Sequence, residues 1–253
     1  MEKNLIEERH KKITFGLALF FACLLFLDFL IISLVYSYSD WIAILLFSLL
    51  FIFPAYISNA GMVLVGGGKP IDKGKYFRDG RRIFGDHKTW NGLIKGPLFL
   101  GIPISIAVAF LFLIIWPSIA EYQRGSAKEG LFVLYKDISY YKYYFIGGTF
   151  PAGFVSLIIR IVLCAYGAAL GDLIGSFLKR RFNMESGAPA PLIDQLDFAL
   201  FAILLTSIPA IFIPDLFWIP DINIIIFLLI LTPSVSVIAN TVAFFLGLKD
   251  VPW

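Results

Sequence analysis

The sequence predicts an all-α protein, a polytopic transmembrane bundle of about six helices with glycine-rich cytosolic loops. Of its 253 residues, 59% are hydrophobic and 15% are charged, whereas an average soluble domain has about 45–50% apolar and about 25% charged residues. A water-facing domain of this length cannot bury so many apolar side chains. The apolar residues form continuous runs that do not alternate with polar ones, so helices are expected to satisfy the backbone in lipid.

An apolar run of about 18 or more residues is long enough to cross a membrane as a helix. The fifth run is short, and it extends to about residue 220 if Asp215 lies at the membrane interface. The first run is too long for the apolar region of a signal peptide, and no small-residue cleavage site follows it. In chain order, the predicted membrane helices are residues 13–36, 41–65, 97–119, 145–171, 198–213 and 224–248.

The distribution of lysine and arginine predicts the side of the membrane that each loop faces, because these residues accumulate in cytosolic segments. With the N-terminus in the cytosol, 16 of them fall in cytosolic segments and four in an outside loop, residues 120–144. We therefore expect a multi-pass protein of the cell membrane with both termini cytosolic. Residues 1–40 are expected to form a cytosolic tail and an extra helix. Residues 41–253 are expected to form a five-helix core with cytosolic loops at 66–96 and 172–197.

The first cytosolic loop, residues 66–96, combines eight basic and three acidic residues with many glycines. Glycine lets backbone N–H groups approach an anion closely, and lysine and arginine bind phosphate oxygens, so the loop predicts a phosphate-rich ligand. The same charges also fit positive-inside topology and attraction to anionic lipid headgroups. No Walker A sequence occurs, and His87 is expected to be a solvated loop residue.

The second cytosolic loop, residues 172–197, places carboxylates beside bases near the membrane surface. Mg²⁺ is usually held by one or two carboxylates, with phosphate oxygens and water completing its coordination. Asp194 and Asp197 are three residues apart and would share one face of a helix; alternatively, Asp197 only caps that helix and complements its dipole. The charged candidates of this loop are Asp172, Lys179, Arg180, Arg181, Asp194 and Asp197.

Two stretches resemble signature stretches of archaeal CDP-archaeol synthases and, more loosely, of bacterial phosphatidate cytidylyltransferases. The first is PAYISNAGMVLVGGGKPIDKGKYFRDGRRIFGDHKTWNG at residues 54–92, and the second is GDLIGSFLKRR…PLIDQLDF within residues 171–198. The resemblance covers about residue 41 to the C-terminus and implies a five-helix core, to which residues 13–36 add a helix. The archaeal type is favoured because the bacterial pattern is replaced at Met184, Glu185, Ala188, Pro189, Ala190, Pro191 and Gln195.

The resemblance implies an integral membrane, Mg²⁺-dependent nucleotidyltransferase. Its substrates would be CTP and an unsaturated, prenylated archaeal diether glycerol phosphate, its products CDP-archaeol and pyrophosphate, and no nucleic acid is expected as a partner. Asp172 and Asp194 are the implied metal ligands, and Lys88, Lys179 and Arg180 the expected catalytic residues that stabilise charge on the phosphates. The expected substrate-binding residues are Asn59, Gly67, Gly68, Lys69, Asp72, Arg81, Arg82, Asp86 and Thr89.

Other functions remain open at this point. One is a phosphatidate cytidylyltransferase that makes CDP-diacylglycerol, and another is a lipid transporter or flippase with helices broken at Pro54, Pro103 or Pro233. A CDP-alcohol phosphotransferase fits less well, because the segment after Asp79 lacks that family's spaced aspartates. Arg160 lies in the fourth apolar run. It is expected to pair with Asp28 rather than bind the lipid phosphate, because an unpaired charge is costly at that depth.

Overall fold

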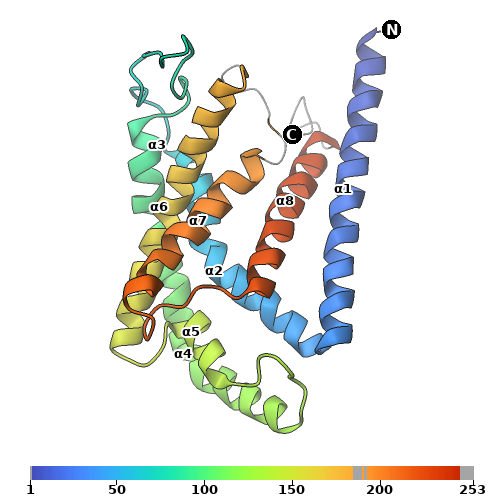
Figure 1. Ribbon diagram of the computed structural model, residues 1–253, viewed down its shortest axis with the longest axis vertical. Coiled ribbons are helices and arrows are strands. Elements are labelled where there is room, and N and C mark those ends of the chain that lie inside the picture. Colours follow the sequence, from blue (N-terminus) through green and yellow to red (C-terminus); the bar gives the residue numbers. More distant parts are fainter. Residues whose placement is uncertain (1, 185–189, 191–192, 246–253) are drawn as a thin grey trace.

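The computed structural model describes residues 2–184, 190 and 193–245 of the chain (Figure 1). Apart from two isolated β-bridges, its regular structure in these residues is helical. Several sequence features lie outside the described residues, namely Glu185, Ala188, Pro189, Pro191 and the C-terminal tail with Lys249. The helices are α1 (Glu2–Val35), α2 (Tyr38–Leu64), α3 (Trp90–Lys95), the π-helix η1 (Gly96–Gly101), α4 (Ile102–Lys128), α5 (Ile138–Ile146), α6 (Ala152–Arg181), α7 (Ile193–Phe212) and α8 (Ile222–Phe245).

Six helical segments of the described chain are long and apolar enough to cross a membrane, which confirms the predicted fold class. Helices α2 and α8 continue through Pro54 and Pro233, so these prolines do not break them. The N-terminal end of α1, the C-terminal end of α8 and the loop of residues 65–89 lie at one end of the molecule (Figure 1). We call this end the loop end; α5 and the segment before it lie at the other.

Several helix boundaries differ from the sequence prediction. Helix α4 continues to Lys128 and so occupies part of the predicted outside loop, because Ala, Glu and Gln are good helix formers even where the chain turns polar. The fourth span begins at Ala152 rather than 145, since Gly147 and Gly148 adopt positive φ angles and end α5 before it. That span runs on to Arg181, so Asp172 and the basic run lie on a helix and not in a loop.

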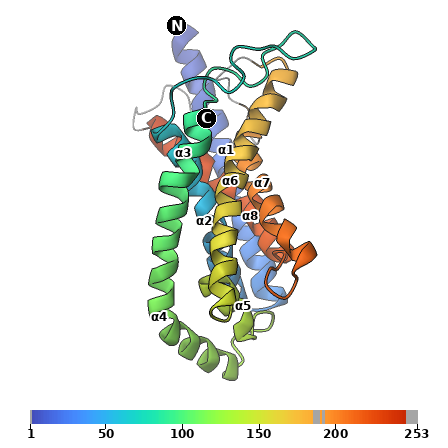
Figure 2. The same ribbon diagram turned by 90° about the vertical axis from the view of Figure 1, so that its left-hand side faces the viewer.

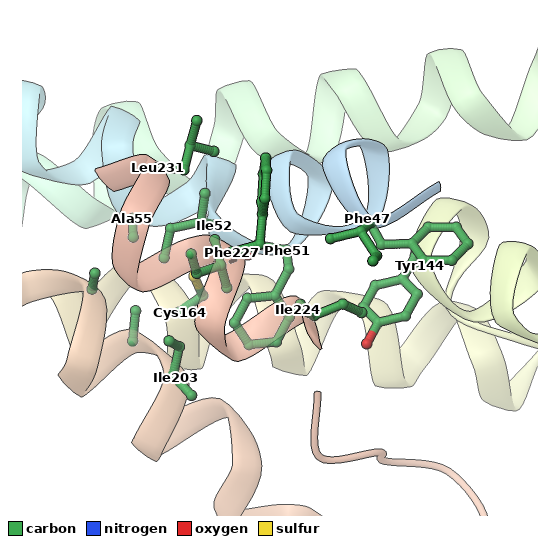
Figure 3. Packing of buried hydrophobic residues seen from close by; sticks show 14 of the residues in the cluster. Phe47, Phe51, Ile52, Ala55, Tyr144, Cys164, Ile203, Ile224, Phe227 and Leu231 are labelled. Carbon is green, nitrogen blue, oxygen red and sulfur yellow. Dashed lines mark hydrogen bonds between the residues drawn. The ribbon is translucent and has the colours of Figure 1, made fainter. Parts of the chain in front are cut away.

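The core lies where α2 crosses α6, α7 and α8 (Figure 3). Phe47 and Phe51 of α2 are buried there, and the ring of Phe47 stacks on Tyr144 of α5 with centroids 4.7 Å apart. Asp40 lies in the first turn of the same helix, and its buried carboxylate accepts the backbone N–H groups of residues 133–135 at 2.9 to 3.1 Å. Helix α2 is therefore anchored at the end opposite the loop end.

The predicted pairing of Arg160 with Asp28 is wrong. Arg160 is 4% exposed, its Nη1 donates to the carbonyl of Tyr143 at 2.9 Å, and its guanidinium lies 4.0 Å over the ring of that tyrosine. Asp28 accepts a hydrogen bond from Trp41 Nε1 at 3.0 Å. The reason is helix adjacency, because α1 packs against α2 and α8 whereas Arg160 on α6 faces α5. A similar depth in the membrane does not reveal which helices are neighbours.

Candidate functional site

The loop of residues 65–89 leaves α2 and returns to α3 at the loop end (Figure 2). Gly67 and Gly68 have φ angles of 87° and 83°, which side chains rarely adopt. The loop closes where Ile71 N–H donates to the carbonyl of Lys88 at 2.8 Å. Thr89 then caps α3, since its Oγ1 accepts the N–H of Gly92 at 3.2 Å. These contacts place Lys88 at the point where the loop rejoins the helices.

Asp72 is the centre of the loop's hydrogen-bond network. Its fully buried side chain accepts Arg82 Nη2 at 2.9 Å and Nε at 3.2 Å, and the N–H groups of Gly74, Phe84 and Gly85 at 3.0 to 3.1 Å. Burial raises the pKa of the carboxyl, but these hydrogen bonds outweigh burial and hold the pKa well below its ordinary value. Asp72 therefore organises the loop from within.

Arg82 serves the same network. Besides Asp72, its Nη2 contacts Asp86 Oδ1 at 2.8 Å, and hydrogen bonds to the two carboxylates raise the pKa of the guanidinium. A planar guanidinium that binds two carboxylates has few free donors. The roles of Asp72 and Arg82 as ligand-binding residues stay predictions, and their contacts in the structure are internal.

A pair of arginines ties this loop to the C-terminal end of α6. Arg81 donates to the backbone carbonyl of Arg181, and Arg181 donates to the carbonyl of Arg82. Arg181 also bonds Asp79 Oδ1 at 2.9 Å, and its guanidinium lies 4.8 Å from the ring of Phe177. Because the last carbonyls of a helix have no partner within the helix, Arg81 completes α6 while it fixes the loop.

The crossing of α6 and α7 brings the predicted aspartates close to the loop. A Cβ atom at Gly171 would lie 2.4 Å from the carbonyl oxygen of Asp197, and one at Gly175 would lie 1.9 Å from Asp197 Oδ2. At Gly171 the nearest atoms are backbone, so only glycine there allows the two helices to approach so closely, whereas a Cβ at Gly175 would displace the side chain of Asp197. Asp197 is thereby within electrostatic range of Asp172 and Asp194.

Two lysines neutralise the predicted metal ligands. Lys88 Nζ lies 2.7 Å from both carboxylate oxygens of Asp172, and Lys179 Nζ lies 2.6 Å from Asp194 Oδ1. In the described chain no three His, Cys, Asp or Glu side chains group closely enough to hold a metal by themselves. One or two carboxylates are nevertheless a usual protein share of a Mg²⁺ site, whose other ligands are phosphate and water, and Asp172 and Asp194 both lie within electrostatic range of Asp197. The donor chemistry of Asp172 and Asp194 therefore fits this ion.

A cavity of about 370 Å³ lies between the loop, α2 and α6. Polar and glycine residues line it together with the apolar residues Met62, Val63, Leu93 and Leu173. Its predicted site residues are Asn59, Gly67, Gly68, Asp86, Lys88, Thr89 and Asp172. Its volume and mixed lining are typical of a site for a small molecule.

The structure separates the remaining predicted residues from this cavity. Arg81, Arg82 and Arg180 line a second cavity of about 270 Å³, while Lys69 is exposed on the loop. His87 is exposed, as expected, yet it lines the first cavity. Sequence reasoning missed the role of Gly175; its spacing of four from Gly171 was a signal for close helix packing.

The chain is similar to a characterised family along most of its length. It matches the family model described as CarS-like, CDP-archaeol synthase, over residues 41–135 and 133–253. It is 38% identical to the CDP-archaeol synthase of Thermococcus onnurineus over 209 residues, which covers 83% of this chain and 97% of that protein. It is also 38% identical to the enzyme of the same name from Methanococcus aeolicus over 207 residues, with 81% and 95% covered.

One solved structure, described as an intramembrane enzyme for archaeal membrane lipid biosynthesis, shares 27% sequence identity with this chain. It covers 78% of this chain and 92% of its own, with a TM-score of 0.45. The family model and the curated relatives span the glycine-rich loop and the α6–α7 crossing. This multi-pass membrane protein is therefore a member of the CDP-archaeol synthase family of enzymes.

Proposed function

We propose that the protein transfers CMP from CTP to the phosphate of an unsaturated archaeal diether glycerol phosphate, producing CDP-archaeol and pyrophosphate. The observation that carries this proposal is the first cavity, where the Lys88–Asp172 pair meets the Gly67–Gly68 loop. The cavity offers the cation Lys88 and glycine backbone groups for phosphates. The apolar residues of its lining suit a lipid that enters from the bilayer.

In the proposed reaction, an oxygen of the lipid phosphate attacks the α-phosphorus of CTP. The new P–O bond forms as the bond to the bridging oxygen breaks, and pyrophosphate leaves with that oxygen and its electron pair. Both reactants are anions, so alignment and charge neutralisation account for most of the catalysis. Lys88, Lys179 and Arg180 are the side chains that neutralise the phosphates, and no covalent nucleophile on the protein is needed.

Mg²⁺ would be held by Asp172 and Asp194, and it would screen the triphosphate and polarise its oxygens. The support is the oxygen-donor chemistry of the two carboxylates. Each now contacts a lysine at 2.6 to 2.7 Å, and that lysine would move to a phosphate oxygen when the metal binds. Replacing either aspartate with alanine is expected to abolish Mg²⁺-dependent CMP transfer while the protein still extracts as a folded species. Turnover like that of the wild type in either variant would contradict this assignment.

We further propose that the loop end faces the cytosol, where CTP is available. The support is the excess of lysine and arginine in the segments at this end, which the positive-inside rule places there. Cysteines introduced one at a time in the loop and in residues 129–137, then labelled in sealed vesicles with an impermeant maleimide, test this orientation. In sealed right-side-out vesicles, labelling of the loop positions would contradict it.

The decisive assay supplies radiolabelled CTP to the purified protein with either a diether or a diester glycerol phosphate. With the label on the α-phosphate, the proposal expects one labelled lipid for each unlabelled pyrophosphate released. The unsaturated diether should be the better substrate. Turnover of phosphatidate alone would instead make the protein a CDP-diacylglycerol synthase. Failure to consume CTP with any lipid phosphate would favour the transporter.

A further inference from the structure

Another cavity lies far from the proposed catalytic site, at the end opposite the loop end, where α2 and α4 meet α5 (Figure 1). We call it the α5 cavity. Its volume is about 370 Å³. Leu46 of α2 and Ser118 and Tyr122 of α4 line it and are exposed, so the cavity is open to the bilayer. Its apolar lining includes Ile42, Ala43, Leu46, Ile119, Phe132 and Phe145.

The α5 cavity exists because α2 and α4 separate toward this end of the molecule. Near the loop end, a Cβ atom at Gly96 would lie 2.7 Å from the backbone nitrogen of Met62, so α2 and η1 are in close contact there. At the other end, aromatic side chains of α5 lie between the helices. Tyr144 stacks on Phe47 of α2, and the ring centroid of Phe145 lies 5.1 Å from that of Phe112 of α4. The cavity is the space that α5 leaves unfilled.

Tyr141 brings an unpartnered polar group to the wall of this apolar cavity. It is 6% exposed, and its ring packs edge-on against Phe47 with centroids 4.9 Å apart. Its buried hydroxyl has no hydrogen-bond partner among the residues that the structure describes. The neighbouring amide of Gln123, by contrast, donates to the carbonyl of Lys136 at 2.8 Å. Because an unmade hydrogen bond of a buried group is costly, a ligand that offers an acceptor oxygen to Tyr141 would be favoured.

The depth of the α5 cavity in the membrane indicates what that ligand is. Ala43 in this cavity and Met62 in the first cavity both lie on α2, about 28 Å apart along the helix axis. This separation is close to the thickness of the hydrocarbon core, about 30 Å. The α5 cavity therefore lies at the other surface of the bilayer, in the opposite leaflet. At that level a bilayer presents the glycerol oxygens and the first chain carbons of its lipids.

Basic residues beside the cavity fit the phosphate of such a lipid. Residues 120–144 contain four basic and three acidic residues, although the sequence places this segment outside. Arg124 follows Gln123 on α4, and the carbonyl of Lys136 accepts the amide of Gln123. Both basic side chains are exposed. Since lysine and arginine bind phosphate oxygens, a lipid headgroup would give these charges a partner.

We propose that the α5 cavity binds one glycerol diether phospholipid of the leaflet opposite the loop end. One hydrocarbon chain fills the apolar cavity, a glycerol oxygen accepts the hydroxyl of Tyr141, and the phosphate lies near Arg124 and Lys136. This lipid is bound in addition to the substrates. It completes the packing between α2, α4 and α5 and is not consumed.

Native mass spectrometry of the purified full-length protein, stripped of lipid in detergent and titrated with a dialkyl glycerophosphoglycerol, tests the site. The phosphate of this probe is a diester and cannot accept CMP. Tyr141→Phe is expected to weaken binding about 3- to 10-fold, the value of a neutral hydrogen bond. Ser118→Trp, which fills the cavity, should weaken it more than about 10-fold. Unchanged affinity in either folded variant would overturn the proposal.

Ile114→Trp is the matched control for added bulk. Ile114 lies on the same helix, is 75% exposed and is not part of the cavity lining. Its replacement should change the affinity less than about 2-fold, as expected for a side chain that makes no contact with the ligand. If Ser118→Trp does not fold, Leu46→Trp fills the cavity from α2 and must weaken binding instead.

Thermal unfolding of Tyr141→Phe distinguishes a ligand contact from a structural one. Removing an unpartnered hydroxyl does not harm the lipid-free protein, so its melting temperature should equal or exceed that of the wild type. The increase on adding the probe lipid should be smaller than in the wild type. A lower melting temperature in the absence of lipid would show that the hydroxyl serves the protein itself and would overturn the assignment.

CMP transfer distinguishes a lipid of the opposite leaflet from the acceptor substrate. The KM for the diether glycerol phosphate in Ser118→Trp should stay within about 2-fold of the wild-type value, because a chain anchored in the first cavity spans only its own leaflet. A clearly raised KM together with lost lipid binding would assign the cavity to the acceptor and overturn the proposal. The lipid titration needs no CTP, so its result stands whether or not the protein transfers CMP.

Discussion

Replacing Asp72 with asparagine tests whether the glycine-rich loop is organised around one buried carboxylate. Oδ1 accepts from Arg82 Nη2 and Gly74 N–H, while Oδ2 accepts from Arg82 Nε, Phe84 N–H and Gly85 N–H. An amide has one acceptor oxygen, so even in its better orientation it loses two of these hydrogen bonds. Its NH₂ group then faces donors.

The size of the effect follows from these contacts. Removing one charged partner of a buried ion pair costs about 3–5 kcal/mol of stability. Because Arg82 keeps Asp86 and is partly exposed, we expect the lower value, about 3 kcal/mol. This corresponds to roughly a 100-fold larger open population of the loop. The amides of Gly74, Phe84 and Gly85 should exchange their hydrogens faster by about this factor.

Asp79→Asn is the matched control within the same loop. Asp79 uses one oxygen, Oδ1, to accept from Arg81 N–H and Arg181 Nη1, so an asparagine can keep both hydrogen bonds. Its cost should stay below about 1 kcal/mol. Hydrogen exchange measured by mass spectrometry compares the two variants, and CTP turnover is measured on the same samples.

Two results would refute this reasoning. Equal loop exchange in Asp72→Asn and in the wild type, with equal turnover, would show that the carboxylate does not hold the loop. Lost turnover with unchanged loop exchange would show instead that Asp72 contacts the substrate, as the sequence alone predicts.

Three further predictions concern packing, pH and the buried arginine. Gly175→Ala should destabilise the protein by about 1–3 kcal/mol and lower CMP transfer, because its Cβ would lie 1.9 Å from Asp197 Oδ2; Gly125→Ala, with nothing within 4 Å, should do neither. The native pKa of Asp72 lies below its unfolded value of about 3.9. The contribution of Asp72 to loop stability is therefore complete above that value and declines as the pH falls toward the native pKa. Hydrogen exchange of the loop amides, corrected for the intrinsic effect of pH, should show this decline in the wild type but not in Asp72→Asn. Arg160→Met should lower the melting temperature while Asp28→Asn changes it little, and exchanging the two charges should not restore stability; recovery in the exchanged variant would revive the pairing.

The fold class could be predicted from the sequence because apolar runs are a one-dimensional signal. The thickness of the bilayer sets the length of a membrane helix, and the structure has all six expected spans in its described residues. The boundaries near Gly147 and Lys128 could not be predicted, because α4 extends past its apolar run as a polar helix and the apolar helix α5 ends in a glycine turn. Helix neighbours, such as α6 and α5 around Arg160, depend on packing that hydropathy does not encode.

For the site, too, the sequence predicted which residues belong to it but not which of them contact one another. Residue types pointed to the loop, the family resemblance pointed to Asp172 and Asp194, and the structure brings Lys88 to Asp172 and Lys179 to Asp194. The sequence alone could not show which arginines have partners within the protein and which are free to bind a ligand, because it gives the charge of each residue but not its contacts. Arg82 faces two carboxylates inside the loop.

The number of basic residues in a loop therefore does not by itself show how many of them can bind a ligand. A cation that already has a buried carboxylate or a helix carbonyl as its partner gains little from a ligand, because binding would first have to break that contact. Arg81 and Arg82 are committed in this way, and their fixed positions shape the wall of the second cavity. Arg180 is buried on α6 and has no side-chain ion pair among the described residues, so no such contact has to break before an anion binds it. The paired arginines therefore build the loop, whereas Lys88 and Lys179, whose carboxylate partners are the proposed Mg²⁺ ligands, keep their proposed role at the phosphates.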